Sequence, residues 1–219
     1  MVTEEELVVP QINLAPGPEY GDEARMFQGI PGLERAPSGR LWAAWYGGGV
    51  TEDRHNYVLL VTSGDDGRRW SGPKLVIDPD GPGPLRAFDP CLWHDPLGRL
   101  WLFWAQGLGE PLEEGHRLWA VTTRNSDREK PTWSEPRYIA PGVMMNKPLV
   151  LSSGEWLLPV ARWHSEGSAG VYVSSDEGAT WEMRGQASIP SPADRNCDEH
   201  MLVERRDGSL WMLVRTMYG

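Results

Sequence analysis

The 219-residue chain has little of what metal, redox or disulfide chemistry requires. Its two cysteines, Cys91 and Cys197, stand in unlike surroundings and do not form a disulfide framework. The five histidines have no close ligand spacing, and no glycine-rich phosphate loop opens a helical segment. We therefore expect neither a bound metal ion nor a cofactor.

The chain also lacks long apolar runs and a surplus of basic residues. No segment approaches the length that spans a bilayer, and the acidic first residues lack the basic and apolar regions of a signal peptide. The formal charge is -10, with no patch that would neutralise phosphates. We expect no membrane or nucleic-acid partner. For the chain as written the expected location is cytoplasmic, with secretion open if a longer protein contains it.

What the chain does contain is typical of short strands joined by turns. It has 12 tryptophans, 25 glycines and 19 prolines, and no helical period of 3.6 residues is sustained. Four segments resemble one another as strand, glycine turn and apolar second strand, at residues 30–45, 89–104, 147–162 and 200–215. Their turn glycines recur about every 55 residues, near the period of propeller blades.

Each period continues with a third and a fourth strand. Third strands are predicted at residues 57–62, 117–123 and 170–174, and the fourth strands are predicted to open with Trp70, Trp133 and Trp181. Four antiparallel strands per period predict an all-β fold, a β-propeller. The apolar second strands are predicted to be buried on both faces between neighbouring blades.

A second repeat links the third and fourth strands. Residues 63–70 and 174–181 both read Ser-x-Asp-x-Gly-x-x-Trp, and a degenerate copy precedes Trp133. The Asp side chain can accept hydrogen bonds from backbone N–H groups just ahead of it, and the Gly can take a positive φ. The repeat therefore predicts a tight turn that stabilises the blade, with a structural role.

This repeat resembles the Asp-box of the bacterial neuraminidase repeat, which occurs in sialidases and other β-propellers. Trp-Ser-x-Pro at residues 70–73 and 133–136 extends the likeness, which covers the chain from Phe27 onward. The resemblance implies a sialidase-like propeller, six-bladed in the family, of which about three and a half blades are present. We expect an N-terminal extension at residues 1–24, blades at roughly 25–80, 81–140 and 141–190, and a half-blade at 191–219. We favour a C-terminally truncated propeller over a short chain that completes its ring by self-association through the open blade edge.

In a propeller the ligand site lies over the central channel, at the starts of innermost strands and in the loops within blades. The chain is polar at those positions, which include Gln28, Asp89, Asn146, Lys147, Asp198, Glu199 and His200. A buried carboxylate is costly unless it is paired or hydrogen-bonded. These carboxylates therefore require cationic partners or a solvated cleft, and Asp89 and His200 are candidate substrate-binding residues.

The resemblance implies an exo-α-sialidase-like glycoside hydrolase that releases a terminal acidic sugar from a glycan. Such enzymes bind the substrate carboxylate with three arginines and use a blade-one Asp as proton donor and a Tyr nucleophile assisted by a Glu. Glu199 matches the assisting Glu, and Arg215 matches an arginine of the clamp. Asp53 is the candidate acid, with Glu52 as its rival, and the adjacent Arg54 is a candidate substrate contact.

The chain departs from the family where blade one begins. Sialidases carry Arg-Ile-Pro there, and this chain has Gly29-Ile30-Pro31, so the first arginine is missing. The third arginine and the Tyr nucleophile would fall in later blades. Arg162 ends its strand as Arg215 does and is a candidate anion clamp or an inter-blade ion-pair partner. The alternatives are a non-catalytic carbohydrate-binding propeller, and a lyase or glycosidase of other sugar specificity with His200 or His55 as proton-transfer group.

Overall fold

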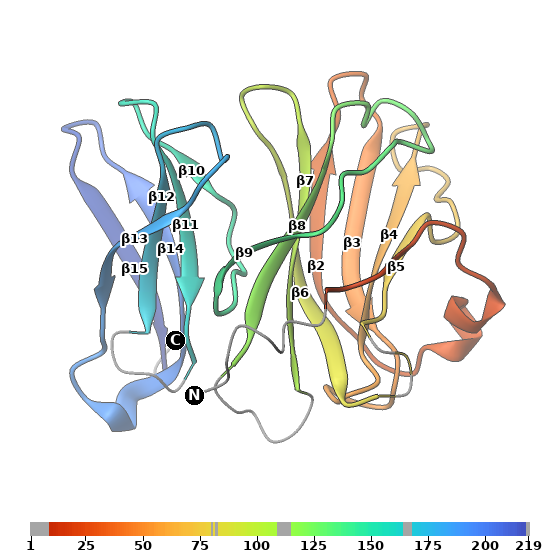
Figure 1. Cartoon of the computed structure of the whole chain (residues 1–219), viewed down its shortest axis with the longest axis horizontal. Coiled ribbons are helices and arrows are strands. Elements are labelled where there is room, and N and C mark those ends of the chain that lie inside the picture. Colours follow the sequence, from red (N-terminus) through yellow and green to blue (C-terminus); the bar gives the residue numbers. More distant parts are fainter. Residues whose placement is uncertain (1–8, 80, 82, 109–114, 164–167, 218–219) are drawn as a thin grey trace.

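A computed structural model describes residues 9–79, 81, 83–108, 115–163 and 168–217 as antiparallel sheets standing side by side (Figure 1). The first sheet has the order β1-β5-β4-β3-β2, with β1 (Ile12–Asn13), β2 (Gln28–Arg35), β3 (Leu41–Gly47), β4 (Tyr57–Ser63) and β5 (Leu75–Ile77). The second sheet contains β6 (Leu85–His94), β7 (Leu100–Leu108), β8 (Arg117–Thr123) and β9 (Arg137–Pro141) in sequence order.

The third and fourth sheets continue this pattern. The third contains β10 (Leu149–Val150), β11 (Trp156–Ala161), β12 (Ala169–Ser174) and β13 (Glu182–Ala187), and the fourth contains β14 (Arg195–Glu204) and β15 (Leu210–Thr216). Within the described residues the helical elements are three short 3-10 turns, η2 (Pro18–Tyr20), η3 (Asp22–Ala24) and η4 (Pro192–Asp194). The predicted all-β architecture of four-stranded blades is confirmed, and the sheets are those of an open, partial propeller.

The first sheet gains a strand that the sequence did not suggest. Ile12 and Asn13, from the segment predicted to be an N-terminal extension, pair with Ile77 and Val76 at the outer edge of β5. A two-residue strand is too short to show a period, so its pairing depends on the neighbouring strand rather than on its own pattern.

The hairpins between first and second strands form around the predicted glycines. Gly39, Gly98, Gly154 and Gly208 have φ of 92°, 76°, 92° and 81°. This left-handed region carries no steric penalty for glycine, which explains why each hairpin turn has one.

The Asp-box turns form as their spacing predicts. In the second copy the Ser174 hydroxyl donates to Asp176 Oδ1 (2.7 Å) and accepts from the N–H of Gly178 (2.8 Å). Asp176 Oδ1 also accepts from the N–H of Thr180 (2.8 Å). The first copy repeats all three bonds, and in the degenerate copy Thr123 donates to Asn125 Oδ1.

The predicted start of two fourth strands is wrong by several residues. β5 begins at Leu75 and β9 at Arg137, after the Trp-Ser-x-Pro segments that were expected to open them. In the first of these segments Ser71 pairs with the third strand partly through its side chain, because its hydroxyl accepts from Thr62 N (3.1 Å) while its own N–H donates to Thr62 O (2.9 Å). A proline two residues later has no N–H to donate, so regular pairing begins beyond it.

Burial of the second strands follows the number of neighbouring sheets. β11 is buried along its whole length and β7 as far as Gly107, as predicted. β15 departs from the prediction, since Trp211 is 52% exposed and Leu213 is 50% exposed. In the described part of the chain, no sheet packs against the outer side of β15.

Within these described ranges, no helix is long and apolar enough to cross a membrane. Both Cys91 and Cys197 are free thiols.

Candidate active site

The candidate site lies where the innermost strands begin, at the end of the sheets that also carries the β3–β4 loop. Because β3 and β4 are antiparallel, this loop and the Asp-box turn lie at opposite ends of the blade. β2, β6 and β14 each contain a register shift near their start. At these bulges Ile30, Asp89 and Cys197 adopt positive φ of 46°, 47° and 59°. Such strained backbone redirects a side chain and is concentrated at functional sites.

Three carboxyl groups from three sheets meet at this end. Asp89 of β6 is 3% exposed. Its pKa is raised to about 7, chiefly by burial and also by the negative charges of Glu199 and Glu52, while the Arg86 guanidinium opposes the rise. Glu52 comes from the β3–β4 loop and Glu199 from β14, so groups far apart in sequence influence one carboxyl. Pairs of acids in unlike environments are the arrangement that acid–base catalysis uses.

Glu199 is the member of this cluster that pairs with an arginine. Its Oε2 lies 2.6 Å from Arg215 Nη1, and this ion pair raises the pKa of Arg215. The Glu199 side chain is 13% exposed and that of Arg215 is 50% exposed. The structure therefore brings the predicted base and the predicted arginine together, in a charge-assisted contact.

Glu52 is held by a tyrosine that the sequence did not single out. The Tyr46 hydroxyl donates to Glu52 Oε1. Tyr46 is 2% exposed, and burial followed by this hydrogen bond raises its pKa. The negative charge of Asp89 also acts on Tyr46, which places this phenol beside the carboxyl cluster.

Asp53 and Arg54 lie in the same loop but have other contacts. Asp53 Oδ1 accepts from the N–H of His55 (2.8 Å), so this carboxylate closes a turn within its own loop. The exposed Arg54 contacts the ring of His55, with 3.4 Å between Nε and Nε2. The role of Asp53 as acid stays a prediction, while Glu52 is the loop carboxyl whose charge acts on Asp89.

Arg86 and Asn56 are site residues that sequence reasoning missed. Arg86 is 2% exposed, its guanidinium carbon lies 4.1 Å from the centre of the Phe88 ring, and its Nη1 donates to Asn56 Oδ1 (3.2 Å). The Asn56 amide also donates to the carbonyls of Gly48 and Thr51 within its own loop, and its main-chain carbonyl accepts from the N–H of Ala87 in the second sheet (3.1 Å). The available signal was an arginine within the otherwise apolar start of β6, where a charge requires a specific partner.

Three aromatic rings pack together near the start of β6. Ring centres are 5.2 Å apart for Phe88 and His116, 5.0 Å for His116 and Trp163, and 5.8 Å for Phe88 and Trp163. Aromatic side chains with a few placed polar groups are typical of small-molecule sites. Phe88 and His116 are 1% and 6% exposed, so these rings support the site from below, and Trp163 is the partly exposed member of the group.

His200 and Arg162 have contacts of a more structural kind. The His200 ring nitrogens contact the carbonyl oxygens of Gly170 (2.8 Å) and Asp198 (3.2 Å), and burial lowers its pKa. Arg162 Nη2 donates to Gln186 Oε1 of the outer strand β13 (3.1 Å). Their roles in substrate binding stay predictions.

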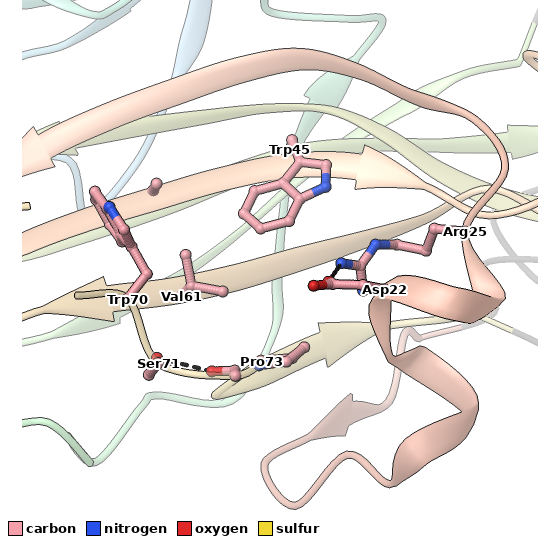
Figure 2. A pocket seen from close by; sticks show the side chains of 9 residues that line it. Asp22, Arg25, Trp45, Val61, Trp70, Ser71 and Pro73 are labelled. Carbon is pink, nitrogen blue, oxygen red and sulfur yellow. Dashed lines mark hydrogen bonds and ion pairs between the residues drawn. The ribbon is translucent and has the colours of Figure 1, made fainter. Parts of the chain in front are cut away.

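A separate hollow of about 480 Å³ opens on the other face of the first sheet (Figure 2). It is lined by Trp45 and Trp70, with Arg25 and Asp22 at one side. Side chains alternate along β3, so Trp45 and Tyr46 point to opposite faces. Arg25 is bound by Asp22, Gln28 and the Tyr20 carbonyl, so this hollow is distinct from the carboxyl cluster.

The family described as "BNR repeat-like domain" matches residues 39–219. The Hadza microbial sialidase Hz136 superposes with a TM-score of 0.67 and 20% identity over 91% of this chain and 44% of its own. A mutant of NanB sialidase from Streptococcus pneumoniae superposes with a TM-score of 0.68 and 15% identity, over 100% of this chain and 53% of its own.

An alpha-L-arabinanase from Penicillium chrysogenum also superposes, with a TM-score of 0.54 and 12% identity over 86% of this chain and 52% of its own. At such identities the likeness shows the fold. The chain spans about half the length of the three structures compared here. No curated protein sequence matches it significantly.

Proposed function

Because the chain belongs to the BNR repeat-like domain family, we propose that it carries part of the active site of a glycoside hydrolase with a sialidase-like fold. The observation that carries the proposal is the meeting of Asp89, Glu52 and Glu199 from three sheets, in unlike electrostatic environments. Hydrolysis of a glycoside needs one group that protonates the leaving oxygen and another that supplies or assists the nucleophile.

Glu199 is the proposed assisting base. Its ion pair with Arg215 holds the carboxylate in place near the start of β14. In the sialidase-like scheme it would deprotonate a Tyr nucleophile, because a protonated phenol attacks poorly.

The proton donor has two candidates, and the geometry favours Asp89. A pKa of about 7 leaves a substantial fraction of this carboxyl protonated at neutral pH, whereas Asp53 Oδ1 already accepts a backbone hydrogen bond. The resemblance favours Asp53 instead. Substrates with good leaving groups distinguish them, because loss of the true acid slows such substrates far less than poor leaving groups.

The resemblance extends the proposal to an exo-enzyme that releases a terminal acidic sugar, with Arg215 as one cation of the carboxylate clamp. Arg162 and Arg54 would be further contacts, together with His200. A non-catalytic carbohydrate-binding propeller is the alternative, in which the same groups would bind a glycan without cleaving it.

The test uses the protein expressed from its complete reading frame and a panel of fluorogenic glycosides that includes an α-sialoside. Release is expected from at least one glycoside, and Glu199→Gln should abolish it. Glu204→Gln is the matched control, because Glu204 lies on the same strand and binds Ser152 rather than Arg215. Binding of a glycan without any cleavage would favour the non-catalytic alternative.

A further inference from the structure

The space beside Gly29 in β2 is already occupied. A Cβ atom added there would lie 3.1 Å from Cζ of Phe27 and 3.3 Å from Cζ of Tyr46. Both atoms belong to aromatic rings, and the Tyr46 ring is buried. A side chain at position 29 would therefore press against these rings, which would have to shift by a few tenths of an ångström. The Tyr46 ring thus lies directly against position 29, where the resemblance implies an arginine.

The group that fills this place is a hydroxyl paired with a carboxylate. Tyr46 pairs with Gly29 across the β2–β3 ladder, and its hydroxyl donates to Glu52 Oε1. Glu52 is exposed, so its carboxylate also faces the space outside the protein. A sugar hydroxyl can donate to a carboxylate, whereas a sugar carboxylate cannot.

The local charge also disfavours an anionic sugar at this point. Glu52 and Asp89 both act on Tyr46, and the cation that opposes them is Arg86. The Arg86 guanidinium is buried, donates to Asn56 and lies over Phe88. Its Nη1 and its π-face are therefore engaged by the protein, and its buried Nε has no partner within the described residues, while a carboxylate placed beside Tyr46 would meet the negative charge of Glu52.

We infer that the site takes a glycone without a carboxylate at its anomeric carbon, a neutral and hydroxyl-rich sugar, and that the Tyr46–Glu52 pair hydrogen-bonds one of its hydroxyls. This inference rests on the proposed glycoside hydrolase function and replaces the acidic sugar that the resemblance implies. Arg215, paired with Glu199, then serves to hold the base rather than to clamp a sugar carboxylate.

The experiment measures kcat/KM of the protein from its complete reading frame with methylumbelliferyl glycosides. An α-sialoside is compared with a panel of neutral hexosides and pentosides. At least one neutral glycoside should be cleaved, and it should exceed the sialoside by on the order of 100-fold or more, the discrimination expected from like-charge repulsion. Comparable or faster cleavage of the sialoside would overturn the inference while leaving the glycoside hydrolase function intact.

Tyr46→Phe keeps the ring and removes the hydroxyl. It should raise KM for the neutral glycoside by about fivefold, the effect of losing one hydrogen bond to a neutral hydroxyl. Tyr172→Phe, at another buried tyrosine, is the control and should leave KM unchanged. Equal KM values in the two variants, with unchanged melting temperatures, would refute the role of the Tyr46 hydroxyl.

If no glycoside is cleaved, the proposed function is refuted, and ligand-observed NMR then tests the sugar preference separately. Neutral monosaccharides should then show saturation transfer that Tyr46→Phe weakens, while N-acetylneuraminic acid should show none. Contact with N-acetylneuraminic acid alone, or with neither kind of sugar, would overturn the inference.

Discussion

Replacing Asp89 by Asn should change how the stability of the protein depends on pH. Burial and the neighbouring carboxylates raise the pKa of Asp89 from 3.8 to about 7 in the folded protein. In the unfolded chain the group has its ordinary pKa, so the folded state binds the proton more tightly between these values. Stability should therefore be highest below about pH 4 with respect to this group, and should fall as the pH rises to about 7.

The magnitude follows from the size of the pKa change. A rise from 3.8 to about 7 corresponds to about 4 kcal/mol at 1.36 kcal/mol per pH unit, as an upper bound. An Asn at this position carries no ionisable proton, so the variant loses this pH dependence. Relative to the native protein, Asp89→Asn should gain up to about 4 kcal/mol between pH 4 and pH 8.

The assay is urea unfolding of both proteins at a series of pH values, followed by tryptophan fluorescence. The quantity of interest is the difference in unfolding free energy between variant and native protein, which cancels the titration of groups that do not interact with Asp89. Asp66→Asn, at an exposed turn residue, is the control and should show no such trend. A difference that stays constant from pH 4 to pH 8, or that falls, would refute the buried, proton-retaining Asp89.

Further predictions concern the turn and the arginine that hold the site. Ser174→Ala should reduce stability by about 1–3 kcal/mol in urea unfolding, because it leaves the buried Gly178 N–H unpaired, and Ser175→Ala at the exposed neighbour should not. Arg86→Lys should reduce stability by about 2–4 kcal/mol, since a lysine cannot both bind Asn56 and stack on Phe88. A loss below about 0.5 kcal/mol in either variant would contradict its assigned contacts.

The repeating parts of the fold could be read from the sequence because they depend on local geometry. Gly39 and Gly98 mark hairpin turns that need a positive φ, and Ser174 with Asp176 closes a turn within a few residues. The start of β5 was misplaced because Ser71 pairs with the third strand through its side chain. A sequence pattern does not distinguish pairing through a side chain from pairing through the backbone.

The site was only partly predictable, because it depends on contacts between blades. Glu199 and Arg215 stand on one hairpin, and a motif was enough to pair them. Arg86 and Tyr46 belong to different sheets, and both interact with Asp89. A local sequence pattern does not predict such a contact between sheets. The choice between Glu52 and Asp53 likewise depends on which carboxylate bonds within its own loop, and this is Asp53, which accepts from the N–H of His55.

Carboxyl groups from separate blades form one acid–base site, and titration of Asp89 by carbon-detected NMR tests this most directly. In the native protein the Asp89 carboxyl should titrate near pH 7, far above its ordinary value. In Glu199→Gln the pKa should fall, because a negative charge that opposes ionisation has been removed. An Asp89 pKa that is ordinary in the native protein, or that is the same in both proteins, would contradict the claim.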